Sequence, residues 1–216
     1  MVSCILLSAG LSTRFGSPKA LATIRGVTVI ERLQRILIES HVGEVIVVLG
    51  AEAEKIRPFL LNDKKLKPVY NADYRLGQTS SVKTGIKVIL NESCGIMLWP
   101  IDYPLIRKET IDQLTLEFLT RRPSVLIPTY TNRKGHPPIF HVSLKTKLLT
   151  IDNHMGINSL QRQFSTLKEL QPCSYLLSVD DPGILCTFNT PEEFTIIRNQ
   201  IEKTTIDIPP NFTPKQ

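Results

Sequence analysis

VSCILLSAGLSTRFGSPK, residues 2–19, is the segment from which the architecture of this chain can be worked out. The apolar run 2–7 predicts a buried strand, which ends abruptly in three small residues. The loop beyond it carries glycines, hydroxyl side chains, Arg14 and Lys19. Small residues let backbone N–H groups approach an anion closely, and arginine and lysine add positive charge that can follow phosphates. A strand that leads into such a loop predicts a nucleoside triphosphate site.

Two better-known phosphate loops do not fit this segment. The P-loop pattern G-x-x-x-x-G-K-[ST] requires lysine directly after its second glycine, and here Ser17 follows Gly16. The dinucleotide fingerprint G-x-G-x-x-G straight after the strand is also absent. The pattern that remains is G-x-S-x-R-F-G-x-x-K, for which a flexible surface loop is the alternative interpretation.

Size and composition describe one globular domain. The chain has 216 residues, of which 42% are hydrophobic and 21% are charged. We expect a domain over residues 1–203 and a frayed tail at 204–216, which has three prolines and no periodic pattern. No apolar run has the length of a membrane span, and the short apolar start lacks the basic region of a signal peptide. These features predict a cytoplasmic protein that does not contact membranes.

Charge and cysteine usage narrow the function classes further. The net charge of +6 agrees with an anionic substrate. Lysine and arginine do not form a stripe interleaved with aromatic residues, so nucleic acid is not an expected partner. The four cysteines have neither a C-x-x-C pair nor a spacing with histidine that suits zinc, and we expect buried, reduced thiols.

Strand and helix patterns alternate along most of the chain. Such alternation predicts an α/β fold in which helices cover both faces of a mostly parallel sheet. The expected strands lie at 2–7, 44–49, 67–70, 95–99 and 124–129, and the expected helices at 28–41, 52–61, 79–91 and 109–121.

The alternation loosens after residue 129. We expect an extended segment at 137–140, short helices at 142–149 and 157–164, and strands at 173–179 and 184–188. A last helix then opens at Thr190, with Pro191 at its first position and Glu193 completing a capping box.

A single carboxylate follows the strand expected at 95–99. In W-P-I-D-Y-P, residues 99–104, two prolines stiffen the turn that holds Asp102. Ligands of open α/β sheets bind beyond the carboxyl ends of the strands, so Asp102 is expected near the loop 10–19. A carboxylate at that place suits Mg²⁺, whereas the alternative interpretation is a solvated turn aspartate.

Two further motifs contain polar groups that suit ligand binding. In N-A-D-Y-R-L-G-Q-T-S-S-V-K-T-G, residues 71–85, hydroxyl side chains stand at a helix N-terminus, where free amides favour an anion or a base carbonyl. Simple N-capping is the alternative interpretation, and Gly85 implies that another backbone or the nucleotide packs closely. In R-K-G-H-P-P-I-F, residues 133–140, a glycine and two prolines hold an exposed loop around His136 in one shape.

Together these motifs resemble those of nucleotidyltransferases related to the molybdenum cofactor guanylyl- and cytidylyltransferases. L-S-A-G-L-S-T-R-F-G-S-P-K, residues 7–19, matches the signature L-x-[AG]-G-x-S-x-R-[FM]-G-x-x-K. The resemblance implies a three-layer α/β/α, Rossmann-like nucleotide-diphospho-sugar transferase fold with a mostly parallel sheet. It also implies a nucleoside triphosphate substrate, Mg²⁺, and release of pyrophosphate.

The resemblance also assigns roles to individual residues. It implies that Arg14, Lys19 and Asp102 are catalytic and that Asp102 and Asn189 bind the metal. The ligand-binding residues that it implies are Leu7, Ser8, Ala9, Gly10, Ser12, Gly16, Asn71, Gly77, Ser80 and Ser81, with His136 meeting the phosphate of the acceptor.

The chain departs from the pattern of this family at two positions. Relatives often carry aspartate where Asn189 precedes T-P-E, and an amide oxygen can bind Mg²⁺ but contributes no charge. The molybdopterin cytidylyltransferases tend to carry glutamine where Tyr103 stands. The first departure weakens metal capture by two residues, and the second weakens the assignment of molybdopterin as the acceptor.

The expected reaction transfers a nucleoside monophosphate, preferably CMP, to a phosphorylated acceptor of the molybdopterin type. The expected partner that receives the product is a molybdenum enzyme. CTP is preferred because guanylyltransferases read L-A-G-G where this chain reads L-S-A-G. Two alternatives stay open. One is a sugar- or alcohol-phosphate nucleotidyltransferase of the same architecture, and the other is a non-catalytic protein that delivers a nucleotide or pterin to molybdenum enzymes.

Overall fold

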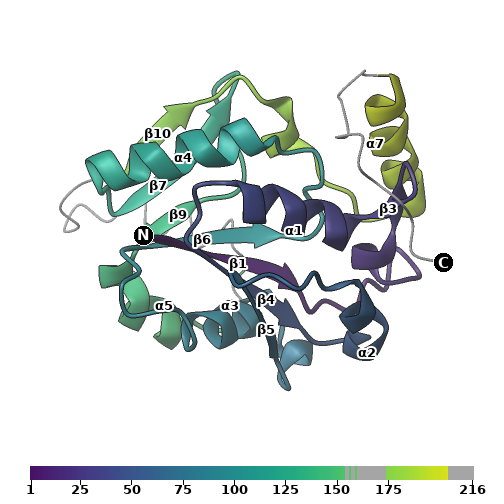
Figure 1. Cartoon of the computed structure of the whole chain (residues 1–216), viewed down its shortest axis with the longest axis horizontal. Coiled ribbons are helices and arrows are strands. Elements are labelled where there is room, and N and C mark those ends of the chain that lie inside the picture. The colour runs from purple at the N-terminus through teal and green to yellow at the C-terminus, as the bar shows by residue number, and fades with distance from the viewer. Residues whose placement is uncertain (154–155, 157–158, 160–173, 204–216) are drawn as a thin grey trace.

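The computed structural model describes residues 1–153, 156, 159 and 174–203 (Figure 1). The tail expected at 204–216 lies outside these residues, as do all but residue 159 of the helix expected at 157–164 and the first residue of the strand expected at 173–179. Within the described part, no helix is both long enough and apolar enough to cross a membrane.

A mixed, mostly parallel sheet forms the middle layer, with the strand order β10-β7-β9-β6-β1-β4-β5 and β8 paired to β7. All neighbouring pairs on this path are parallel except those of β9, which runs antiparallel between β6 and β7. The strands are β1 (Val2–Ser8), β4 (Glu44–Leu49), β5 (Leu66–Tyr70), β6 (Gly95–Pro100), β7 (Val125–Tyr130), β8 (Arg133–Lys134), β9 (Ile139–His141) and β10 (Tyr175–Ser178). A separate hairpin pairs β2 (Thr23–Ile24) with β3 (Val27–Thr28).

Helices cover both faces of the sheet, with α1 and α4 on one side and α3 and α5 on the other (Figure 1). Their bounds, with those of two further helices, are α1 (Val29–Glu39), α2 (Ala53–Ile56), α3 (Gln78–Ile86), α4 (Lys108–Arg121), α5 (Lys145–Thr150) and α7 (Pro191–Lys203). Short 3-10 turns lie at Lys19–Leu21, Arg57–Phe59, Tyr74–Leu76, Val142–Leu144 and Pro182–Leu185. The predicted three-layer α/β/α class is therefore confirmed.

Alternate residues of the central strand supply the two halves of the core. Leu6 of β1 belongs to the cluster that contains Leu33 of α1 and Phe118 of α4. Its neighbour Ile5 belongs to the cluster on the opposite face, with Val82 of α3. All seven residues of β1 are buried, as expected of a strand covered on both faces. The apolar run that predicted this strand is thus the centre of the fold.

The predicted strands at 44–49, 67–70, 95–99 and 124–129 are confirmed to within a residue or two. The predicted start of α1 is also confirmed, because the Thr28 side chain accepts a hydrogen bond from the Glu31 amide while Glu31 bonds back to the Thr28 amide. Of the described cysteines, Cys4 is buried as expected, whereas Cys94 and Cys186 are partly exposed.

Several expected element bounds were wrong, each for a local reason. The helix expected at 52–61 is α-helical only over Ala53–Ile56, because Pro58 lacks an amide hydrogen and the chain tightens into a 3-10 turn. The helix expected at 79–91 ends at Ile86, and the amide of Leu90 instead donates to the Glu44 carboxylate at 3.0 Å. The α1 helix ends at Glu39 rather than 41.

The strand expected at 184–188 was wrong in kind. Residues Pro182–Leu185 form a 3-10 turn, because the Asp181 carboxylate accepts a hydrogen bond from the Gly183 amide at 2.9 Å. The chain then turns toward the end of β6, where the Phe188 amide donates to the carbonyl oxygen of Asp102 at 3.3 Å.

Gly85 lies inside α3, where a side chain of β1, rather than another backbone, packs against it. A Cβ atom at this position would lie 2.5 Å from Cγ2 of Ile5 in β1. The glycine therefore lets α3 lie directly on the central strand.

Asp181 connects the C-terminal segment to α4. Its buried carboxylate accepts hydrogen bonds from the Arg107 amide at 2.9 Å and the Thr110 hydroxyl at 2.6 Å, in addition to the Gly183 amide. One side chain thus caps the α4 N-terminus and holds the turn that leads to residues 187–189. Because it satisfies three donors at once, it is important for the stability of this region.

We predict that Asp181→Ala destabilises the protein by about 3 kcal/mol and lowers its melting temperature by roughly 6–12 °C, because three donors lose their acceptor. Thermal unfolding followed by circular dichroism measures the effect. Asp180→Ala is the matched control, since Asp180 is the exposed neighbour. Equal melting temperatures for the two variants would contradict the role assigned to Asp181.

Candidate active site

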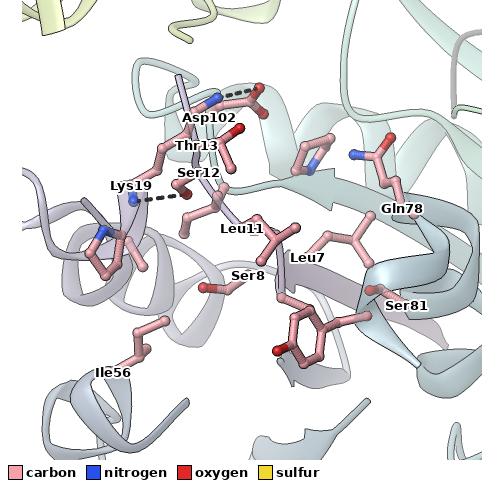
Figure 2. A pocket seen from close by; sticks show the side chains of 18 of the residues that line it. Leu7, Ser8, Leu11, Ser12, Thr13, Lys19, Ile56, Gln78, Ser81 and Asp102 are labelled. Atoms are coloured by element: carbon pink, nitrogen blue, oxygen red, sulfur yellow. Dashed lines mark hydrogen bonds and ion pairs between the residues drawn. The ribbon is translucent and has the colours of Figure 1, made fainter. Parts of the chain in front are cut away.

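A cleft of about 330 Å³ opens where β1 and β6 end side by side (Figure 2). In the sheet, β4 lies on one side of β1 and β6 lies on the other, so the strand order reverses at β1. Ligands of open α/β sheets bind at such a reversal. The lining residues are Leu7, Ser8, Ala9, Gly10, Leu11, Ser12, Thr13, Arg14, Pro18, Lys19, Ala20, Ile56, Tyr74, Arg75, Gly77, Gln78, Ser81, Pro100, Ile101, Asp102 and Asn189. This volume lies within the range of small-molecule sites.

The loop after β1 is held in a tight turn. The amides of Phe15 and Gly16 both donate to the carbonyl oxygen of Ser12 at 3.0 Å, and the Ser12 hydroxyl accepts from the Lys19 amide at 3.3 Å. Gly16 has a φ of +78°, a conformation that L side chains rarely adopt. Phe15 is buried against Phe188, with ring centroids 5.2 Å apart. The loop is therefore fixed from within and from the C-terminal segment.

Two cations of this loop converge on one amide oxygen. The Arg14 guanidinium donates to Oδ1 of Asn189 at 3.1 Å, and the Lys19 ammonium donates to the same atom at 3.0 Å. Lys19 Nζ also lies 3.5 Å from Oδ2 of Asp102 (Figure 2). Burial lowers the pKa of Lys19, and the Asp102 charge partly opposes that shift. The predicted catalytic residues and the predicted metal ligands thus meet at one place.

Residues that do not line the cleft contact Asp102 and its neighbour Tyr103. The Thr187 hydroxyl donates to Oδ2 of Asp102 at 3.1 Å. Burial, together with the nearby charge of Asp102, raises the pKa of Tyr103 to about 12. The ring of His136 packs on that of Tyr103, with centroids 4.5 Å apart.

The opposite wall of the cleft is built by the segment that follows β5. Asn71 donates to the hydroxyls of Ser80 at 2.9 Å and Ser81 at 3.0 Å, and its own Oδ1 accepts from the Asp73 amide at 3.0 Å. Asn71 therefore ties the end of β5 to the first turn of α3. Gly77, with a φ of +102°, makes the sharp entry into that helix.

The structure brings together most of the residues predicted for the site. The predicted residues that line the cleft are Leu7, Ser8, Ala9, Gly10, Ser12, Arg14, Lys19, Gly77, Ser81, Asp102 and Asn189. Gly16, Asn71, Ser80 and His136 lie outside the lining. The hydrogen bonds and turn geometry of the first three support the shape of the wall. The loop around His136 was expected to be exposed, but residues 135–140 are buried, and His136 itself is 4% exposed. Its contact with an acceptor phosphate stays a prediction.

Several lining residues were not predicted. Tyr74 and Gln78 belong to the motif that predicted the α3 N-terminus, and their places beside Gly77 would have indicated them. Ile56 lies in α2 and carries no polar group, so nothing in its local sequence marks it as part of a cleft.

A divalent metal fits the oxygen atoms of the cleft. Oδ2 of Asp102 and Oδ1 of Asn189 face the same cationic group, the Lys19 ammonium, which therefore marks a place where these atoms hold a positive charge. Among the described residues, no three histidine, cysteine, aspartate or glutamate side chains gather into a metal cage. Mg²⁺ is commonly held by one or two protein oxygens together with substrate phosphates.

The comparison with protein families now identifies the chain. Residues 4–170 match the family model described as the MobA-like NTP transferase domain. The chain belongs to this family. The match includes the loop after β1, the β5–α3 segment and Asp102, whereas Thr187 and Asn189 lie beyond its end.

Relatives of this MobA-like NTP transferase include proteins of two nucleotide specificities. The molybdenum cofactor cytidylyltransferase of Escherichia coli is 22% identical over 193 residues, which cover 89% of this chain and 93% of the relative. A probable molybdenum cofactor guanylyltransferase of Bacillus velezensis is 26% identical over 207 residues, which cover 94% of this chain and 98% of the relative. Both matches span nearly the whole of each protein.

A solved structure has the same fold. The nucleotidyl transferase Mth528 from Methanothermobacter superimposes with a TM-score of 0.76 at 20% sequence identity, and the match covers 94% of this chain and 98% of that one. This MobA-like NTP transferase therefore has the Rossmann-like fold of nucleotidyltransferases. Its choice between cytidylyl and guanylyl transfer is a separate question, because its relatives include both.

Proposed function

We propose that the protein transfers CMP from CTP to a phosphorylated acceptor of the molybdopterin type and releases pyrophosphate. One observation carries this proposal. Arg14 and Lys19, from the loop after β1, converge with Asp102 and Asn189 in a cleft of suitable size at the ends of β1 and β6. The relatives named as molybdenum cofactor nucleotidyltransferases support the choice of acceptor.

The chemistry follows from the charges in the cleft. The triphosphate lies along the loop 10–19, where Arg14 and Lys19 neutralise the charge that accumulates on the leaving pyrophosphate. A phosphate oxygen of the acceptor attacks the α-phosphorus in line, and the bond to the β-phosphate breaks. An ionised phosphate needs no general base, so positioning and charge neutralisation are sufficient. Asp102 and Asn189 would hold Mg²⁺, which supplies further positive charge at the phosphates.

Two small residues at the end of β1 support the choice of nucleotide. Ala9 lines the cleft, and its methyl group packs in the core beside Gly50. Guanylyltransferases of the family read L-A-G-G here, with glycine at the position of Ala9, so the alanine favours CTP. Ser8 also lines the cleft, and its buried hydroxyl has no hydrogen-bond partner among the described residues. A polar atom of a bound base at this wall would give the Ser8 hydroxyl a hydrogen-bond partner and remove the free-energy cost of leaving it unpaired.

Pyrophosphate release from CTP, GTP, ATP and UTP, each with and without molybdopterin, tests the proposal. We expect release only with molybdopterin and fastest with CTP. The double variant Ser8→Ala/Ala9→Gly, which recreates L-A-G-G, should shift the ratio of kcat/KM for CTP over GTP by about tenfold toward GTP, the size typical of a small change in pocket shape.

Each other outcome points to a different function. Release that requires a sugar or alcohol phosphate in place of molybdopterin would make the protein a nucleotidyltransferase with another acceptor. Nucleotide binding without release in any combination would make it a non-catalytic carrier. An unchanged ratio of kcat/KM for CTP over GTP in the double variant would show that Ser8 and Ala9 do not select the base. It would not contradict the proposed reaction.

A further inference from the structure

Thr187 attaches the C-terminal segment to Asp102 at the edge of the cleft. Its hydroxyl donates to Oδ2 of Asp102 at 3.1 Å, and the amide of the next residue, Phe188, donates to the Asp102 carbonyl oxygen at 3.3 Å. The segment therefore holds both the backbone and the side chain of Asp102. Two attachments of this kind restrict the carboxylate to one orientation.

Tyr103 follows Asp102 directly in the chain, and its side chain is a neighbour of the Thr187 side chain.

The Tyr103 ring is itself held in place by its surroundings. The His136 ring packs on it with centroids 4.5 Å apart, and the Trp99 indole donates to the Tyr103 carbonyl oxygen at 3.2 Å. The His136 amide donates to the carbonyl oxygen of Ile184 at 3.0 Å, which joins the His136 loop to the same C-terminal segment. The motif around His136 thus supports the residues behind Asp102.

Tyr103 and Thr187 do not line the cleft, whereas Asp102, which accepts the Thr187 hydrogen bond, does. We propose that Thr187 is a positioning residue that orients the Asp102 carboxylate toward the metal–nucleotide complex. This inference rests on the proposed function in taking Asp102 as the metal ligand. Partners behind a metal ligand typically change metal affinity or activity by about 10–100-fold when they are removed.

The variants that test the inference differ by single groups. Thr187→Val removes the hydroxyl and keeps the shape, whereas Thr187→Ser keeps the hydroxyl. Thr120→Val is the matched control, because the Thr120 hydroxyl donates to the Leu116 carbonyl oxygen within α4 at 2.9 Å. Mn²⁺ binding with CTP present, measured by electron paramagnetic resonance, gives a readout that does not depend on turnover.

For Thr187→Val we expect about tenfold weaker Mn²⁺ binding and a kcat lower by about 10–100-fold. The KM for CTP and the melting temperature should stay near their wild-type values. Thr187→Ser should restore both Mn²⁺ affinity and kcat.

Several outcomes would overturn the inference. One is unchanged Mn²⁺ affinity in Thr187→Val, and another is failure of Thr187→Ser to rescue that affinity. The Mn²⁺ measurement does not depend on turnover. A wild-type protein that binds Mn²⁺ without releasing pyrophosphate would therefore contradict the proposed function, and the Mn²⁺ affinities of the variants would still test the positioning role. A wild-type protein that binds no Mn²⁺ would remove both the metal site and the role of Thr187.

Discussion

Asp102→Asn is expected to lower kcat for pyrophosphate release by about 10³-fold, because the substitution removes the carboxylate charge on which the proposed metal site depends. The amide keeps the shape of the side chain and can still accept a hydrogen bond from Thr187. Folding should therefore be preserved, with a melting temperature near that of the wild type. Assays of pyrophosphate release at fixed time points, with CTP and acceptor present, measure this loss of kcat.

The control for this experiment is a second lysine–aspartate pair outside the cleft. Lys108 and Asp112 lie in α4 with Nζ and Oδ2 2.6 Å apart, and neither lines the cleft. Asp112→Asn removes one negative charge from the protein without touching the site, so its kcat should be unchanged. If Asp102→Asn turned over as fast as Asp112→Asn, Asp102 would have no part in the reaction.

Lys19→Met is expected to lower kcat by roughly 10²–10³-fold, since it removes a fixed positive charge from the phosphates of the leaving group. The same variant should bind Mn²⁺ more tightly than the wild type when no nucleotide is present. In the free protein the Lys19 ammonium lies 3.5 Å from Oδ2 of Asp102 and 3.0 Å from Oδ1 of Asn189, where it repels a second cation. Loss of turnover combined with gain of metal affinity is specific to this position.

Lys108→Met provides the matched control, because it removes one positive charge beside an aspartate of α4. It should change neither kcat nor Mn²⁺ binding. Wild-type turnover in Lys19→Met would exclude the phosphate role of Lys19. Unchanged Mn²⁺ affinity in that variant, together with lost turnover, would show that the ammonium does not compete with the metal in the free protein.

Local sequence patterns predicted structure correctly where the conformation of a residue depends on its neighbours in the chain. The apolar run 2–7 predicted β1 because a strand covered on both faces has to be apolar throughout. The glycines, hydroxyls and cations that follow predicted a phosphate-binding loop, and the structure places that loop at the edge of a cleft. Asp102 was predicted at the same edge, because the carboxyl ends of parallel strands lie together.

Local patterns failed where distant segments determine the conformation. The apolar residues at 184–188 predicted a strand. The Asp181 carboxylate instead binds the Gly183 amide just before this segment, and the Asp102 carbonyl oxygen binds the Phe188 amide at its end, so the chain turns away from the sheet. The motif around His136 predicted an exposed loop, whereas the tertiary structure buries residues 135–140 and packs the His136 ring on Tyr103. Neither arrangement leaves a signal in the spacing of nearby residues.

The central strand, the loop after β1 and the carboxylate beyond β6 could be predicted from local sequence, because each depends on residues close together in the chain. The surroundings of that carboxylate depend on the fold. Asn189 reaches Lys19 from 170 positions away and Thr187 reaches Asp102 from 85 positions away. These meetings depend on the order of the strands in the sheet and on the turn held by Asp181, and both are set by packing between distant segments.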